Sequence, residues 1–188
     1  MYRNLFFVFV FMLQGCTIDL MSRPSQEELA RIKTPPPHIK QRIDTLLPKV
    51  VAWYTQAQKH LRSKGRVLSP KERIFAKSLG IKQINRIRIV TVDAFPQPED
   101  AQLQEAAKRY GFDSPYAGGL TLGHTVLIKK DFLQNPVIVP HELVHVAQVE
   151  RMGLKSFLRR YLTELEVVGY RKNTLEIEAY KKQGKLSS

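Results

Sequence analysis

Residues 140–145 read Pro140-His141-Glu142-Leu143-Val144-His145, with two histidines four positions apart and a glutamate after the first. In a helix, residues i and i+4 lie on one face, one turn apart. His141 and His145 could therefore direct two imidazoles at a single metal ion, with Glu142 beside it as a general base. A pattern this short also arises by chance, so its flanks have to support it.

The helix that carries this pattern is expected from about Pro136 or Pro140 to Met152. It is apolar on most sides and is therefore expected to be buried. Unpaired polar groups in a protein core cost several kcal/mol, so the histidines and the glutamate need partners there. A metal ion supplies such a partner. The apolar residues of this helix are Val139, Leu143, Val144, Val146, Ala147 and Val149.

A third metal ligand is expected downstream, on a second helix, because catalytic zinc takes three protein ligands and leaves one position open for water. Residues 170–180 form a helical segment with two carboxylates, Glu176 and Glu178. Residues two apart lie about 200° apart around a helix, so only one of the two can face the metal.

Three features together resemble the gluzincin zinc metallopeptidases: the His-Glu-x-x-His pattern, the segment 118–124 before it and Glu176-Ile177-Glu178-Ala179 after it. The resemblance covers about residues 65–181 and is strongest to minimal domains of uncharacterised bacterial envelope proteins. It implies a zincin-like fold with His141, His145 and Glu176 as zinc ligands and Glu178 as the alternative third ligand. Ala179 matches the gluzincin pattern, whereas Tyr180 replaces its frequent aspartate.

The same resemblance implies a peptidase mechanism. Zinc lowers the pKa of its bound water and polarises the scissile carbonyl, and Glu142 takes the water proton and passes it to the leaving amine. A further donor is expected for the developing oxyanion. The candidates for that donor are His124, Tyr161 and Tyr170. Gln148 is expected to support a metal ligand or the structure rather than to react. In gluzincins, an edge strand at the place of segment 118–124 binds extended peptide by β-augmentation.

The N-terminus is expected to direct export. Residues 1–15 contain a basic Arg3 and an apolar run from Leu5 to Leu13, which is too short to span a bilayer but is typical of a signal peptide. The following Leu13-Gln14-Gly15-Cys16 resembles a bacterial lipobox, apart from Gln14, and implies lipidation of Cys16, the only cysteine. Thr17 after that cysteine favours the outer membrane, facing the periplasm. The alternatives are an ordinary secretory signal or an uncleaved anchor.

Composition suits one globular domain, with 43% hydrophobic residues and a formal net charge of +13 over 188 residues. We predict a signal peptide at 1–15, a lipidated N-terminus with a Pro-rich tether at 16–37, and a zincin-like domain at 38–188. The positive charge favours anionic lipid or cell-wall polymer as a partner. Nucleic acid is not an expected partner of an exported lipoprotein. The alternative to a membrane-anchored peptidase is a non-catalytic zinc-binding lipoprotein that acts as a scaffold for such polymers or lipids.

The predicted fold class is α+β, with a small mixed or antiparallel sheet packed on the motif helix and C-terminal helices that close the core. Helical periodicity from His38 to Arg62 is expected to break or kink at Pro48. Ser69-Pro70-Lys71-Glu72 predicts a helix start, and residues 101–110 predict another helix. Residues 84–92 and 120–128 each predict one strand, with Gly123 as a bulge or a point of close approach.

Overall fold

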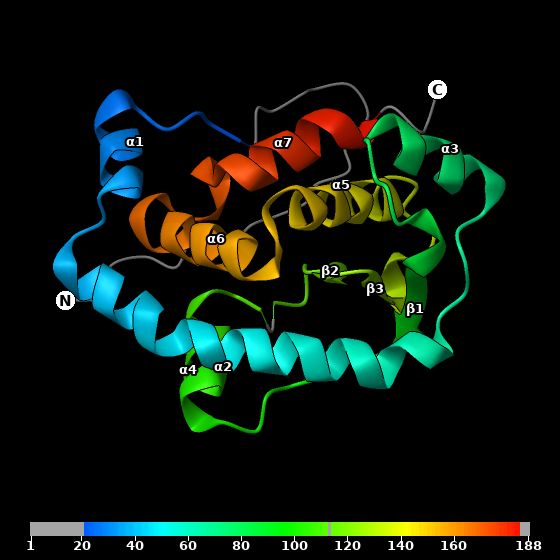
Figure 1. Ribbon diagram of the computed structural model, residues 1–188, viewed down its shortest axis with the longest axis horizontal. Helices are drawn as coiled ribbons and strands as arrows, with labels where there is room; N and C mark the ends of the chain where they lie inside the picture. The colour runs from blue at the N-terminus through cyan, green and yellow to red at the C-terminus, as the bar shows by residue number, and fades with distance from the viewer. Residues whose placement is uncertain (1–20, 113, 185–188) are drawn as a thin grey trace.

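The computed structural model describes residues 21–112 and 114–184 of the chain. It is an α+β protein, as predicted, and its described residues form seven α-helices and one three-stranded sheet (Figure 1). The helices are α1 (Gln26–Lys33), α2 (Pro37–Leu61), α3 (Pro70–Ser78), α4 (Ala101–Arg109), α5 (Ile138–Met152), α6 (Leu154–Val168) and α7 (Thr174–Gln183). The strands are β1 (Arg88–Val92), β2 (Gly119–Leu122) and β3 (Thr125–Lys129).

The sheet is mixed, with strand order β1-β3-β2. β1 pairs with β3 in parallel, and β2 pairs with β3 antiparallel. The prediction of one strand over residues 120–128 is therefore wrong: this segment is a hairpin that turns at Gly123 and His124. Gly123 has φ 64°, a backbone conformation that glycine adopts without steric cost. Residues 84–86 are a 3₁₀ turn rather than part of the strand that was predicted over 84–92.

The sheet lies between two helical layers, and α2 runs along one side of it (Figure 1). Val90 and Leu127 on this side pack against Ala57 of α2. The side chains that alternate with them, such as Ile89 and Val126, pack against Leu143 of α5. Because both faces are covered, the strands are apolar on both sides, which is typical of a buried sheet.

The start of α7 is fixed by hydrogen bonds to Asn173 and to Glu164 of α6. Asn173 caps α7 by accepting hydrogen bonds from the backbone N–H groups of Leu175 and Glu176. Glu164 of α6 is fully buried and accepts from the backbone N–H and the hydroxyl of Thr174. These bonds fix the first turn of α7, which carries Glu176.

Two features of the N-terminal half bear on the predictions for it. α2 continues through Pro48 without a break. Residues 21–36 contain α1, capped by Ser25, and this helix is held to the domain where Lys172 pairs with Glu28 at 2.7 Å. The backbone N–H of Ser22 also donates to the carbonyl of Arg171 at 3.0 Å. The described part of the predicted tether is therefore docked rather than free.

The export predictions fall on residues that the structure does not describe. Cys16 and the segment 1–15 lie outside the described residues. Among the helices of residues 21–184 that the structure describes, none combines the length and apolar character needed to cross a membrane.

Candidate metal centre

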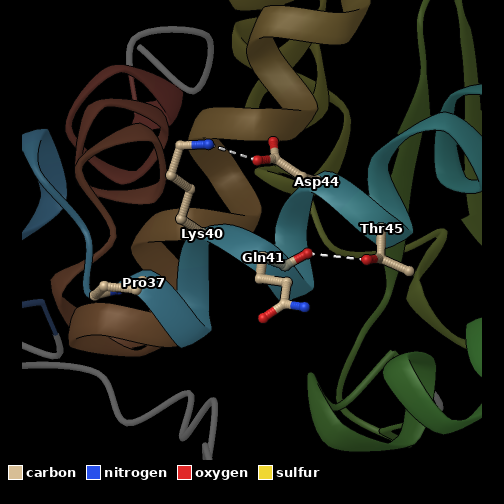
Figure 2. Close-up of a pocket in the computed structure, with 5 residues that line it drawn as sticks. All are labelled: Pro37, Lys40, Gln41, Asp44 and Thr45. Atoms are coloured by element: carbon tan, nitrogen blue, oxygen red, sulfur yellow. Dashed lines mark hydrogen bonds and ion pairs between the residues drawn. The ribbon is translucent and has the colours of Figure 1, made fainter.

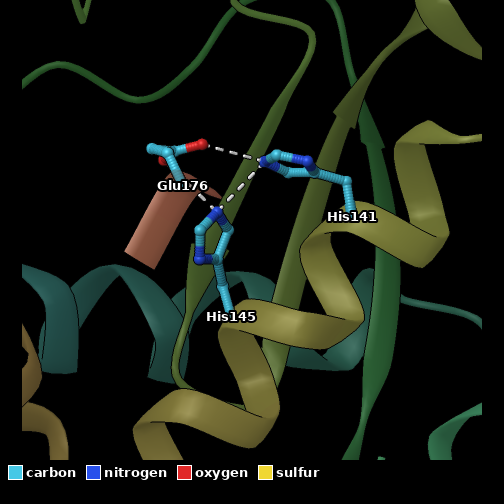
Figure 3. A group of neighbouring side chains, drawn as sticks. All are labelled: His141, His145 and Glu176. Atoms are coloured by element: carbon cyan, nitrogen blue, oxygen red, sulfur yellow. Dashed lines mark hydrogen bonds and ion pairs between the residues drawn. The ribbon is translucent and has the colours of Figure 1, made fainter. Parts of the chain in front are cut away.

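Three buried side chains from α5 and α7 converge on one point (Figure 3). The Nε2 atoms of His141 and His145 lie 3.1 Å apart. Oε2 of Glu176 lies 3.1 Å from Nε2 of His141, and its Oε1 lies 3.4 Å from Nε2 of His145. α5 places the histidines one turn apart on one face, and α7 brings the carboxylate across from them. The predicted grouping of these three residues is thus present in the structure.

The separations fit ligation of a single small ion. Ligands at 2.0–2.1 Å from a tetrahedral zinc ion lie about 3.4 Å from one another. The distance between the two Nε2 atoms, and the distance from each Nε2 to one of the two Glu176 oxygens, lie close to that value. With one ligand atom taken from each residue, all three atoms lie within 4.8 Å of one another. Two imidazoles and one carboxylate also form a donor set that zinc takes in catalytic sites.

The ligands are electrostatically coupled. Burial raises the pKa of the Glu176 carboxyl, but the charge of His145 and hydrogen bonds from both histidines outweigh burial and hold that pKa well below its usual range. Burial lowers the pKa of His145, but the charge of Glu176, the hydrogen bonds to Glu176 and Gln148 and the charge of Glu142 together outweigh burial and raise that pKa to about 9. When no metal is bound, protonated His145 supplies the positive charge beside Glu176.

The far nitrogen of each imidazole contacts a glutamine. Nδ1 of His141 lies 2.7 Å from Oε1 of Gln183, and Nδ1 of His145 lies 2.8 Å from Oε1 of Gln148. An Nδ1–H that donates to an amide oxygen leaves the Nε2 lone pair for a metal. Both histidines are therefore oriented with Nε2 toward the shared point.

Glu142 lies next to the histidines but is directed toward β2. Its Oε2 accepts a 2.6 Å hydrogen bond from the hydroxyl of Thr121, which also donates to the carbonyl of Glu142 at 3.0 Å. Gly119 lies beneath this carboxylate, and a Cβ on Gly119 would lie 2.7 Å from Cδ of Glu142. The glycine is thus needed for the close approach of β2 to α5.

β2, the strand beside Glu142, is an edge strand of the sheet, and Thr121 on it is buried. Lys129 donates its backbone N–H to Gly118, and hydrogen-bonded residues alternate along an antiparallel pair. The N–H and C=O groups of Gly119 and Thr121 therefore point away from β3. Among the described residues no further strand pairs with β2 on that side.

The three candidate oxyanion donors lie in different surroundings. The hydroxyl of Tyr161 donates to Oε1 of Glu176 at 2.6 Å, so it contacts a proposed ligand. The Tyr170 hydroxyl lies 3.3 Å from that of Tyr180, whose ring packs edge-on against His141. His124 is in the hairpin turn, and its Nε2 lies 2.8 Å from Oε1 of Glu150 rather than at the triad.

Glu178, the alternative third ligand, is not grouped with the histidines. Its carboxylate pairs with Arg151 at 2.9 Å and with Lys182 at 2.7 Å. It also accepts a hydrogen bond from Nε2 of Gln148 at 3.0 Å. The structure thus groups Glu176, and not Glu178, with His141 and His145.

Two pockets lie away from the triad. One of about 460 Å³ is lined by residues of α2, where Lys40 pairs with Asp44 and Thr45 donates to the carbonyl of Gln41 (Figure 2). The other, of about 450 Å³, lies between α2 and α6. Neither is lined by a ligand residue, so neither is part of the candidate centre.

Sequence reasoning did not find Thr121 or Gln183 as parts of the site. Thr121 contacts Glu142 across 21 positions, and Gln183 contacts His141 across 42. No local pattern signals pairs so far apart.

In comparisons with known proteins, no family model, no curated protein and no solved structure matches this chain.

Proposed function

We propose that this chain is a gluzincin-like zinc metallopeptidase that hydrolyses peptide bonds. The observation that carries the proposal is the convergence of His141, His145 and Glu176 on one point, with Glu142 on the same helix turn as His141. Zinc bound there would polarise the scissile carbonyl of a peptide substrate and lower the pKa of its bound water. His141, His145 and Glu176 would hold it.

The remaining roles belong to side chains and backbone groups around the ligands. Glu142 is the proposed general base, which accepts a proton from the attacking water and delivers it to the leaving amine. The Thr121 hydroxyl orients that carboxylate. The outward N–H and C=O groups of Gly119 and Thr121 offer an extended peptide the hydrogen bonds of an added strand.

Metal content followed by mutation tests the proposal. We expect one zinc per wild-type chain and loss of zinc in His141→Ala and in His145→Ala. Glu142→Gln should keep zinc and abolish cleavage of a peptide library. Glu150 also lies on α5, but its carboxylate contacts His124 and none of the proposed ligands. Glu150→Gln is therefore the matched control and should retain cleavage. Cleavage that survives in Glu142→Gln would exclude Glu142 as the base.

A second candidate is a non-catalytic zinc-binding protein that acts as a scaffold for anionic lipid or cell-wall polymer. The burial of all three ligands favours it, since His141, His145 and Glu176 are 8%, 6% and 2% exposed. Zinc binding without cleavage of any library peptide, and with equal behaviour of wild type and Glu142→Gln, would support this candidate over the peptidase.

We further propose that the protein is a lipoprotein of the bacterial envelope, anchored through Cys16 to the outer membrane and facing the periplasm. Radiolabelled palmitate tests this anchor. We expect label on the wild type and none on Cys16→Ser. Label of equal strength on both proteins would exclude Cys16 as the lipidated residue.

A further inference from the structure

Gln148 is fully buried between α5 and α7 and makes three hydrogen bonds with its side-chain amide. Its Oε1 lies 2.8 Å from Nδ1 of His145. Its Nε2 lies 2.9 Å from the carbonyl oxygen of Leu175 and 3.0 Å from Oε2 of Glu178. One side chain therefore connects a proposed ligand on α5 with two groups on α7.

These partners determine which way the amide faces. A backbone carbonyl and a carboxylate only accept hydrogen bonds, so the two N–H groups of Gln148 have to face Leu175 and Glu178. The amide oxygen is then left for His145, whose Nδ1 has to carry a hydrogen. In a neutral imidazole, this leaves the lone pair on Nε2, the atom that faces the other two ligands.

Glu178 is itself fixed by two cations. Its Oε2 lies 2.9 Å from Nη2 of Arg151, and its Oε1 lies 2.7 Å from Nζ of Lys182. Glu178 therefore accepts hydrogen bonds from both cations and from the Gln148 amide, and these contacts hold its carboxylate in place.

We propose that Gln148 and Glu178 are positioning residues of the metal centre: Glu178 fixes the Gln148 amide, and this amide selects Nε2 of His145 as the metal-binding atom. The inference rests on the metal centre of the proposed function. It assigns a role to the carboxylate that the sequence offered as an alternative ligand. Glu178 acts through Gln148 and not by contact with the metal.

Gln183 provides a matched comparison. Its Oε1 accepts from Nδ1 of His141 at 2.7 Å, and this is the contact that places it at the site. Gln183 lies in the last turn of α7 and is only partly buried. A carboxylate at position 183 would accept the same hydrogen bond, whereas a carboxylate at position 148 would have no N–H group for Leu175 and would repel Glu178.

The experiment measures Zn²⁺ affinity of the full chain by competition with a chromophoric chelator. We expect Gln148→Glu to weaken Zn²⁺ binding about 10- to 100-fold, the range for partners that orient metal ligands. Gln183→Glu keeps an acceptor for Nδ1 of His141 and should weaken Zn²⁺ binding less than Gln148→Glu does. An equal or larger loss in Gln183→Glu would overturn the inference. Equal affinities of folded Gln148→Glu and wild type would overturn the inference alone, and a wild type that binds no Zn²⁺ would overturn the metal centre with it.

Glu178→Ala covers the case in which Gln148→Glu does not fold. Glu178 is near the surface, so its removal should leave the fold intact. We expect weaker Zn²⁺ binding in Glu178→Ala and unchanged binding in Lys181→Ala, a neighbouring exposed cation of α7. Unchanged affinity in Glu178→Ala would overturn the role of Glu178. Long-range ¹H–¹⁵N correlation spectra of the zinc-loaded wild type should show a protonated Nδ1 on His145, and ligation through Nδ1 would overturn the inference.

Discussion

The hydroxyl of Tyr161 donates a 2.6 Å hydrogen bond to Oε1 of Glu176 and so connects α6 to the carboxylate of the metal centre. Burial and the charge of Glu176 raise the pKa of the Tyr161 hydroxyl well above its usual value, so it remains a hydrogen-bond donor. The same oxygen lies 3.4 Å from Nε2 of His145, and the other oxygen lies 3.1 Å from Nε2 of His141, so this bond helps to fix the carboxylate between the two histidines. We therefore expect Tyr161 to orient the Glu176 carboxylate rather than to act as an oxyanion donor.

Tyr161→Phe removes this bond with little change in volume. We expect Zn²⁺ affinity to fall about 10-fold or more, as for other partners that orient ligands. Chelator competition measures the change, and Tyr170→Phe, whose hydroxyl contacts Tyr180 and not a ligand, is the control. Unchanged affinity with reduced peptide turnover would instead assign Tyr161 to transition-state stabilisation.

Gly119→Ala introduces a methyl group against the carboxylate of Glu142. We expect Zn²⁺ to be retained and peptide cleavage to be lost, because the methyl group would displace Glu142, the proposed general base, from its position above β2. Gly118→Ala is the matched control, since its methyl group would meet the ring of Phe132 and not Glu142. Overpacking should cost both variants about 1–3 kcal/mol of unfolding free energy. If both lose cleavage equally, the effect comes from strain in β2.

Glu166 connects three helices, and its loss should give a pH-dependent loss of stability. It pairs with Arg42 of α2 at 2.7 Å and accepts from the hydroxyl of Tyr110, just after α4, at 2.7 Å. Burial raises the pKa of the Glu166 carboxyl, but Arg42 and Tyr110 outweigh it and lower the pKa. A lowered pKa stabilises the fold above the unfolded-state pKa, and this stabilisation is lost as pH falls through the folded-state pKa.

Glu166→Gln should therefore lower the unfolding free energy by about 1–3 kcal/mol at pH 7, the range for hydrogen bonds to charged groups. The difference between wild type and variant should shrink as the pH falls below the usual glutamate range. Urea unfolding at pH 7 and at pH 3 measures both values. A difference that is the same at both pH values would show that the charge of Glu166 does not contribute.

His124→Ala should leave Zn²⁺ affinity unchanged, because the imidazole contacts Glu150 and none of the ligands. The unfolding free energy should fall by about 1 kcal/mol, the value of one net hydrogen bond. Thermal unfolding and chelator competition on the same samples separate the two effects. Weaker Zn²⁺ binding in this variant would connect the hairpin turn to the metal centre.

Features that depend on neighbouring residues were predictable from the sequence. The start of α3 was predicted from Ser69 and Glu72, and the structure has both hydrogen bonds of that capping box. The motif helix was predicted from its apolar residues, and α5 spans Ile138–Met152. Both depend on side chains within one or two helical turns.

Features that depend on tertiary packing were not predictable. The hairpin at Gly123 was missed because both faces of the sheet are covered, so residues 120–128 are apolar on either side of the turn and show no change in pattern. Pro48 was expected to break or kink α2, and no break occurs between Pro37 and Leu61. Pro48 is solvent-exposed, where water can satisfy the carbonyl that its missing N–H leaves free. The contact between Gln183 and His141 depends on how α7 docks on α5.

The hydrogen bond from Ser22 to Arg171 sets how far an anchored domain could range. Cys16 precedes Ser22 by only six positions, a length of chain that extends to about 20 Å at most. A free chain up to Pro37 would extend to about 70 Å. The proposed lipid on Cys16 would therefore keep the domain almost in contact with the bilayer surface, and the proposed peptidase would then act only on substrates that reach the membrane.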